Sequence, residues 1–73
     1  MRDYHINIFY SSEDEAYIAD IPDLAFCSAA GDTPAEALEE ILRAKEAWLE
    51  AAKESDRQIP APTYRPAIYK VAF

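Results

Sequence analysis

The chain has 73 residues, a single cysteine and a formal net charge of −7 with a pI near 4.4. This length predicts a single domain over residues 1–73, and one cysteine excludes an internal disulfide. The acidic balance argues against direct nucleic acid binding, which depends on clustered Lys and Arg, and favours encounter with a basic protein. Acidity that serves only solubility is the alternative.

The chain is expected to be cytoplasmic and to need a partner copy. It has no basic N-terminal region followed by an apolar run, and no stretch near the roughly 18 apolar residues of a membrane span, so we expect no leader and no membrane contact. A domain of this size buries only about 60% of its unfolded surface. With no disulfide and no metal-binding cluster to support such a core, we expect a homo-oligomer, a dimer or larger.

Two strands are predicted at the N-terminus. Residues 4–10 alternate between one face with Tyr and Ile and another with His5, Asn7 and Phe9, as in a half-buried strand. Residues 11–15 are all polar and predict a hairpin turn. A second strand should cover residues 16–21, because Pro22 cannot donate to a ladder and ends it.

A weaker third strand and a strong helix follow. Residues 26–30 alternate but are mostly small, and Gly31 and Asp32 close them. The helix is predicted over residues 33–54, because Thr33, Pro34 and Glu36 form a capping box with proline at the first helical position. In such a box Thr33 accepts from the backbone N–H of Glu36, and the Glu36 carboxylate reaches back.

The helix is amphipathic over about half of its circumference. That arc is wider than the roughly 100° stripe that one sheet contact needs, so part of it could meet a second subunit. Lys45 interrupts the arc, and two interpretations stay open: its stem covers apolar surface while the ammonium reaches water, or it pairs with a carboxylate. The apolar side consists of Ala37, Leu38, Ile41, Leu42, Trp48, Leu49 and Ala52.

A connector and a last strand complete the predicted fold. Two prolines in residues 59–62 require an extended connector, and residues 68–73 alternate as a strand. The order is then β-β-β-α-β, an α+β fold with an antiparallel sheet covered on one face by the long helix. The last strand could join its own sheet by a right-handed crossover or pair with a neighbouring chain.

The sequence offers little for catalysis, and we expect no enzyme and no cofactor. The one histidine, His5, is far in sequence from Cys27, which has apolar neighbours and is predicted to be a small core residue rather than a reactive thiol. Asp20, Asp23 and Asp32 lie near strand ends where metal ligands could converge. Because Asp23 and Asp32 also suit turn and pre-cap positions, no metal site is predicted.

Four short motifs in order resemble the HicB-like antitoxin family. They are Tyr-Ile-Ala-Asp-Ile-Pro-Asp-Leu-Ala-Phe-Cys at residues 17–27, Gly-Asp-Thr at 31–33, Glu-Ala-Leu at 36–38 and Ile-Pro-Ala-Pro at 59–62. The resemblance covers residues 4–63. Two departures matter. Family members commonly have Pro-Gly where this chain has Ala25 and Phe26, and longer members carry a C-terminal DNA-binding domain, so their autorepressor role is not expected of a chain that ends at Phe73.

The resemblance implies a fold and a role. The fold is a partial ribonuclease H-like β-β-β-α-β domain without the nuclease carboxylates. The role is that of a type II antitoxin that masks a small basic toxin, an mRNA-cleaving ribonuclease with a double-stranded-RNA-binding-type fold. We expect Tyr17, Asp20, Asp23 and Phe26 to contact the partner, with sheet packing and turn formation as their alternative. The alternative function is an orphan oligomeric domain that binds a different protein or a small ligand.

Overall fold

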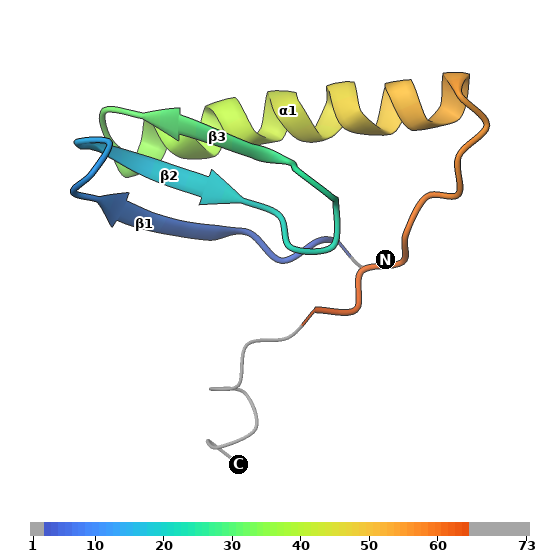
Figure 1. The fold of residues 1–73 in the computed structure, drawn as a ribbon, viewed down its shortest axis with the longest axis horizontal. Coiled ribbons are helices and arrows are strands. Elements are labelled where there is room, and N and C mark those ends of the chain that lie inside the picture. The colour runs from blue at the N-terminus through green and yellow to red at the C-terminus, as the bar shows by residue number, and fades with distance from the viewer. Residues whose placement is uncertain (1–2, 65–73) are drawn as a thin grey trace, which may run out of the picture.

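The computed structural model describes residues 3–64 and shows a three-stranded sheet with one long helix. The strands β1 (Asn7–Ser11), β2 (Ala16–Asp20) and β3 (Ser28–Gly31) are antiparallel in the order β1-β2-β3, and helix α1 (Pro34–Glu54) follows them (Figure 1). The α+β class and the first four elements of the predicted order are confirmed. The predicted last strand, 68–73, lies outside the described residues.

The strand register gives the sheet two different faces. Ile8 pairs with Ala19 and Ala19 with Ala29, and Ala19 is buried in the core under α1. Neighbouring residues point to the opposite side. The other face carries no helix within the described residues, and we call it the open face. Its side chains are Asn7, Phe9, Ser11, Ala16, Ile18, Asp20, Ser28 and Ala30.

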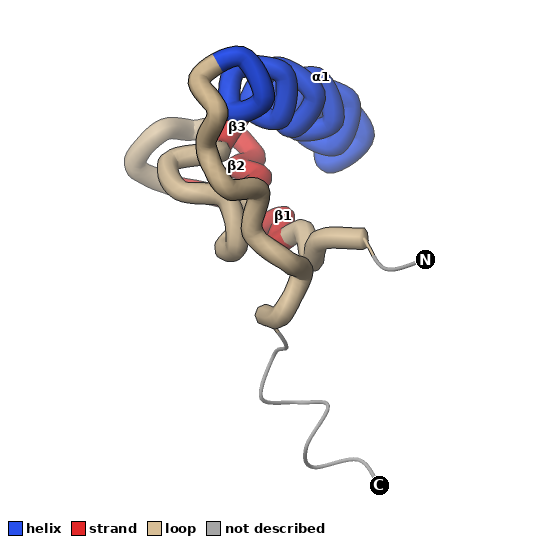
Figure 2. The backbone as a smooth tube through the Cα atoms, turned by 90° about the vertical axis from the view of Figure 1, so that its right-hand side faces the viewer, coloured by secondary structure: helices blue, strands red, loops and turns tan. Residues whose placement is uncertain are grey.

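Helix α1 is not centred on the sheet. It contacts β3 most and β1 least, as the end-on view of Figure 2 shows. The indole N–H of Trp48 donates to the carbonyl oxygen of Ala25 (2.9 Å), which ties α1 to the loop before β3. Of the predicted apolar arc, Ala37, Ile41 and Ala52 are buried. Leu38 and Leu42 keep about two fifths of their surface exposed on the described part of the chain.

The core consists of small and medium side chains. Buried residues of the sheet, the loop after β2 and the helix form one cluster of Ala19, Ile21, Leu24, Cys27, Ala37 and Ile41. Burial raises the pKa of the Cys27 thiol, which suits a core residue rather than a nucleophile, and the prediction of a buried Cys27 is confirmed. Gly31 belongs to β3 instead of closing it. A Cβ there would lie 2.5 Å from the backbone nitrogen of Ala37.

The start of α1 follows the predicted capping box. The backbone N–H of Glu36 donates to Thr33 Oγ1 (3.1 Å), and Glu36 Oε1 accepts from the backbone N–H of Asp32 (2.9 Å) rather than of Thr33. Lys45 adopts the carboxylate-paired alternative, with its Nζ 3.2 Å from Asp3 Oδ1. Because Asp3 is mostly exposed, this ion pair is worth no more than about 1 kcal/mol.

The connector is fixed to the residues that precede β1. That strand begins at Asn7 and not at residue 4, because its partner β2 ends at Asp20 and the chain then enters the loop before β3. The hydroxyl of Tyr4 donates to the carbonyl oxygen of Pro60 (2.5 Å), and the His5 ring contacts the Tyr64 ring with centroids 5.0 Å apart. Tyr4 also packs against the core. Tyr4 and His5 therefore hold the connector through their side chains and do not pair with another strand.

Candidate partner-binding site

The loop of residues 21–27 is closed by hydrogen bonds of its own backbone, and we call it the presenting loop. The backbone N–H of Ile21 donates to the Cys27 carbonyl (3.1 Å), that of Leu24 to Ile21 (3.1 Å) and that of Cys27 to Leu24 (3.2 Å). The side chains of these three residues are buried. Since its backbone groups are paired with each other and its apolar residues are anchored in the core, the loop forms a firm base for the residues between them.

Phe26 stands out on the presenting loop. Its side chain is fully exposed, and its backbone φ is +60°, a left-handed conformation that favours glycine. A non-glycine residue in this region costs on the order of 1–3 kcal/mol. Within the described chain no other residue covers the Phe26 ring.

Asp20 and Phe26 both line a shallow hollow of about 200 Å³. The hollow lies where β2 ends and β3 begins, because Asp20 and Ser28 are paired across the two strands. Both belong to the open face. Its lining residues are Asp20, Ile21, Pro22, Leu24, Ala25, Phe26, Cys27 and Ser28. The open face and the presenting loop therefore form one continuous surface.

Tyr17 does not belong to this surface. It pairs with Tyr10 and Gly31 on the side of the sheet that faces α1, and its ring meets that of Tyr10 edge-on with centroids 5.2 Å apart. It also packs against the core cluster. Tyr17 therefore makes the sheet-packing contacts that were the alternative to a contact with the partner.

Asp23 holds the connector. Its carboxylate accepts from the backbone N–H of Tyr64 (3.0 Å), and from the backbone N–H and the hydroxyl of Thr63 (both 3.1 Å). These hydrogen bonds, the one from Tyr64 foremost, lower the pKa of Asp23 below its ordinary value. Asp23 therefore lies in the predicted turn and also binds the connector some forty residues further along the chain.

Phe9 and Ile18 were not among the predicted site residues, and the structure places them in an apolar patch. They are paired across β1 and β2 at the centre of the open face, with Ala30 near them on β3. Phe9 is 51% exposed and Ile18 is half-buried. The signal was present in the sequence, because the alternation of residues 4–10 places Phe9 opposite the Tyr and Ile side. This alternation separates the two faces of the strand, but which face stays uncovered is known only from the position of α1.

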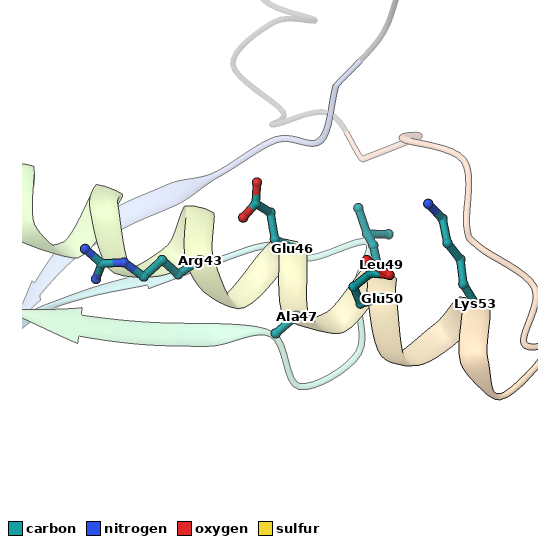
Figure 3. A pocket seen from close by; sticks show the side chains of 6 residues that line it. All are labelled: Arg43, Glu46, Ala47, Leu49, Glu50 and Lys53. Carbon is teal, nitrogen blue, oxygen red and sulfur yellow. The ribbon is translucent and has the colours of Figure 1, made fainter.

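Two further hollows lie along α1. The first is an open depression whose lining side chains all come from α1 itself, as Figure 3 shows for Arg43, Glu46, Ala47, Leu49, Glu50 and Lys53. The second, of about 330 Å³, lies between α1 and the connector and is lined by Asp3, Tyr4, Lys45, Leu49, Lys53, Ile59 and Pro62. Neither contains a histidine, cysteine or serine that could act as a nucleophile or base.

The residues weighed for chemistry are dispersed. His5 Nε2 lies 2.6 Å from Asn7 Oδ1 and the His5 ring contacts Tyr64, whereas the Cys27 thiol is buried in the core. Over residues 3–64, no three His, Cys, Asp or Glu side chains gather as metal ligands would. No helix within that range is both long and apolar enough to cross a bilayer.

Comparisons with known proteins identify one family and one curated relative. The model of a family described as "HicB_like antitoxin of bacterial toxin-antitoxin system" matches residues 4–70. A curated relative, UPF0150 protein ssl0259 from Synechocystis sp., is 35% identical over 54 residues, which cover 74% of each chain. No solved structure gives a significant match.

Proposed function

Because the chain belongs to the HicB-like antitoxin family, we propose that it is the antitoxin of a type II pair and masks a small basic toxin by direct contact. The toxin would be an mRNA-cleaving ribonuclease with a double-stranded-RNA-binding-type fold. The match over residues 4–70 is the observation that carries this proposal. We further propose that the chain acts in the cytoplasm, without catalysis of its own and without direct contact to nucleic acid.

The charge and the surface of the chain support such a role. A net charge of −7 attracts a basic protein over long range and accelerates encounter. Asp20 and Phe26 supply a carboxylate and an exposed aromatic ring at one hollow, and residues of these kinds anchor protein interfaces. Tyr17 and Asp23 would serve the site indirectly, Tyr17 by packing the sheet and Asp23 by holding the connector against the presenting loop.

We propose that residues 68–73 add a strand to give the partial ribonuclease H-like β-β-β-α-β topology, and that the chain forms a dimer or larger homo-oligomer. The exposed parts of Leu38 and Leu42 support self-association, because they extend the apolar arc of α1 beyond what the sheet covers.

The proposal expects a short basic protein to be encoded beside this chain, and the test uses that protein, which we call the neighbouring toxin. Expressed alone, it should cleave mRNA and arrest growth. With this chain co-expressed, growth should recover and the two proteins should purify together. An unrelated acidic protein of similar size, expressed in place of this chain, controls for charge alone. The absence of such a gene, or unrestrained RNA cleavage in the presence of this chain, would favour the orphan oligomeric domain.

A further inference from the structure

We infer that the neighbouring toxin docks on the open face of the sheet, with Phe26 inserted into an apolar pocket on the toxin and Asp20 paired with a Lys or Arg beside that pocket. This inference depends on the proposed function and goes further, because it assigns the contact surface and the residue that determines specificity. It also excludes α1 as the principal contact surface.

Phe26 has the features of an anchor. Its ring is fully exposed and projects from a loop that is closed by three backbone hydrogen bonds and by buried side chains. An aromatic side chain has only two torsions to immobilise, and rings that fill partner pockets account for much of the binding energy at protein interfaces. The backbone at Phe26 is left-handed, as it also is at Glu15 and Asp56, so the full exposure of the ring on a closed loop is the feature that distinguishes Phe26.

The open face supplies the rest of the contact surface. Phe9, Ile18 and Ala30 form an apolar row across its centre, and the row is continuous with Asp20 and the presenting loop. An apolar centre with polar residues at its margin is the usual arrangement of a protein interface. Among the described residues of the open face Asp20 is the one charged side chain, so a cation on the partner would find a single carboxylate to pair with.

The outer side of α1 is a less suitable docking surface, and a second copy of this chain is a less suitable occupant of the open face. The outer side of α1 carries long, solvated Glu side chains, and one of them, Glu40, already pairs with Arg43. Such charges mainly raise the association rate. A second copy of this chain would bring another net charge of −7 and another Asp20 without an added cation on that face. A basic partner opposes the net charge of this chain and supplies a cation for Asp20.

The experiment compares two pairs of variants for binding to the neighbouring toxin and for thermal stability. Phe26→Gly should weaken binding by about 30-fold or more, as expected for a hot-spot residue. Its melting temperature should stay the same or rise, because glycine accepts the left-handed backbone. Phe9→Ser should also weaken binding. Tyr10→Ser is the matched control, since Tyr10 is the next residue on β1, is about equally exposed and points to the opposite face. Because this variant also loses the edge-on contact with Tyr17, its binding is compared at a temperature below the melting transition of every variant.

The outcomes separate this inference from the proposed function. If the wild-type chain does not bind the neighbouring toxin, the proposed function fails and the docking surface fails with it. If the wild type binds and Phe26→Gly binds equally well, the docking surface is wrong and the antitoxin role stands. Weakening by Tyr10→Ser that matches Phe9→Ser would place the toxin on the α1 side. Loss of self-association, rather than of toxin binding, in Phe26→Gly would assign the surface to a second copy.

Discussion

Gly31→Ala tests how closely α1 approaches the sheet. Gly31 ends β3 on the side that faces the helix, and a Cβ there would lie 2.5 Å from the nitrogen of Ala37 and 2.8 Å from both the carbonyl carbon and the Cβ of Glu36. Ordinary contacts begin near 3.4 Å, so the first turn of α1 would have to withdraw by roughly 0.9 Å. Two of the three obstructing atoms are backbone, which a change of rotamer cannot move.

The magnitude follows from what that shift disturbs. The first turn carries Ala37, which is fully buried and packs in the same cluster as Ile41. Inserting a methyl group into a well-packed contact costs about 1–3 kcal/mol, and alanine returns roughly 0.4–1 kcal/mol by restricting the unfolded chain. A net loss of about 1–2 kcal/mol compares with a total of about 4–11 kcal/mol for a domain of this length. The melting temperature should fall by about 4–16 °C.

Thermal and urea unfolding followed by far-UV circular dichroism provides the assay. Ala30→Ser is the control, because Ala30 is the preceding residue, is exposed and points to the open face, so its stability should stay within about 0.5 kcal/mol of wild type. A Gly31→Ala protein as stable as wild type would refute the close packing of α1 against β3.

Three further changes probe the core, the helix cap and the connector. Ile41→Ala should lose about 2–5 kcal/mol in urea unfolding because its side chain is fully buried, whereas Leu42→Ala, with about two fifths of its side chain exposed, should lose clearly less. Thr33→Ala should lose about 1 kcal/mol in the same assay by removing the oxygen that accepts from Glu36. For Asp23 the folded pKa lies below the ordinary value of 3.8, so its stabilisation is present above that pH and is lost as the pH falls through the folded pKa. Melting temperatures of wild type and Asp23→Asn should therefore differ at neutral pH and converge in acid; a constant difference would contradict the role of the carboxylate.

Local signals in the sequence predicted the elements well. The capping box at Thr33 placed the first turn of α1, because cap chemistry depends only on residues three apart. Alternation and the proline after β2 located β2 and separated the two faces of the sheet. Cys27 was correctly assigned to the core from its apolar neighbours.

Features that depend on distant residues were not predictable. Asp23 is some forty residues from Tyr64, and no periodicity marks their hydrogen bond. The displacement of α1 toward β3 results from packing between side chains of several elements, so the exposure of Leu42 could not be deduced from the helix pattern alone. The left-handed backbone of Phe26 has no signal in this sequence, because glycine is the residue that favours such a conformation, and it is visible only in the structure.

Titration of the neighbouring toxin with the wild-type chain in an RNA-cleavage assay tests the central claim most directly. We predict that cleavage falls steadily and ends near the stoichiometric point of the complex, and that Tyr10→Ser inhibits as the wild type does while Phe26→Gly requires a large excess. Cleavage that continues undiminished at high excess of the wild-type chain would contradict the claim.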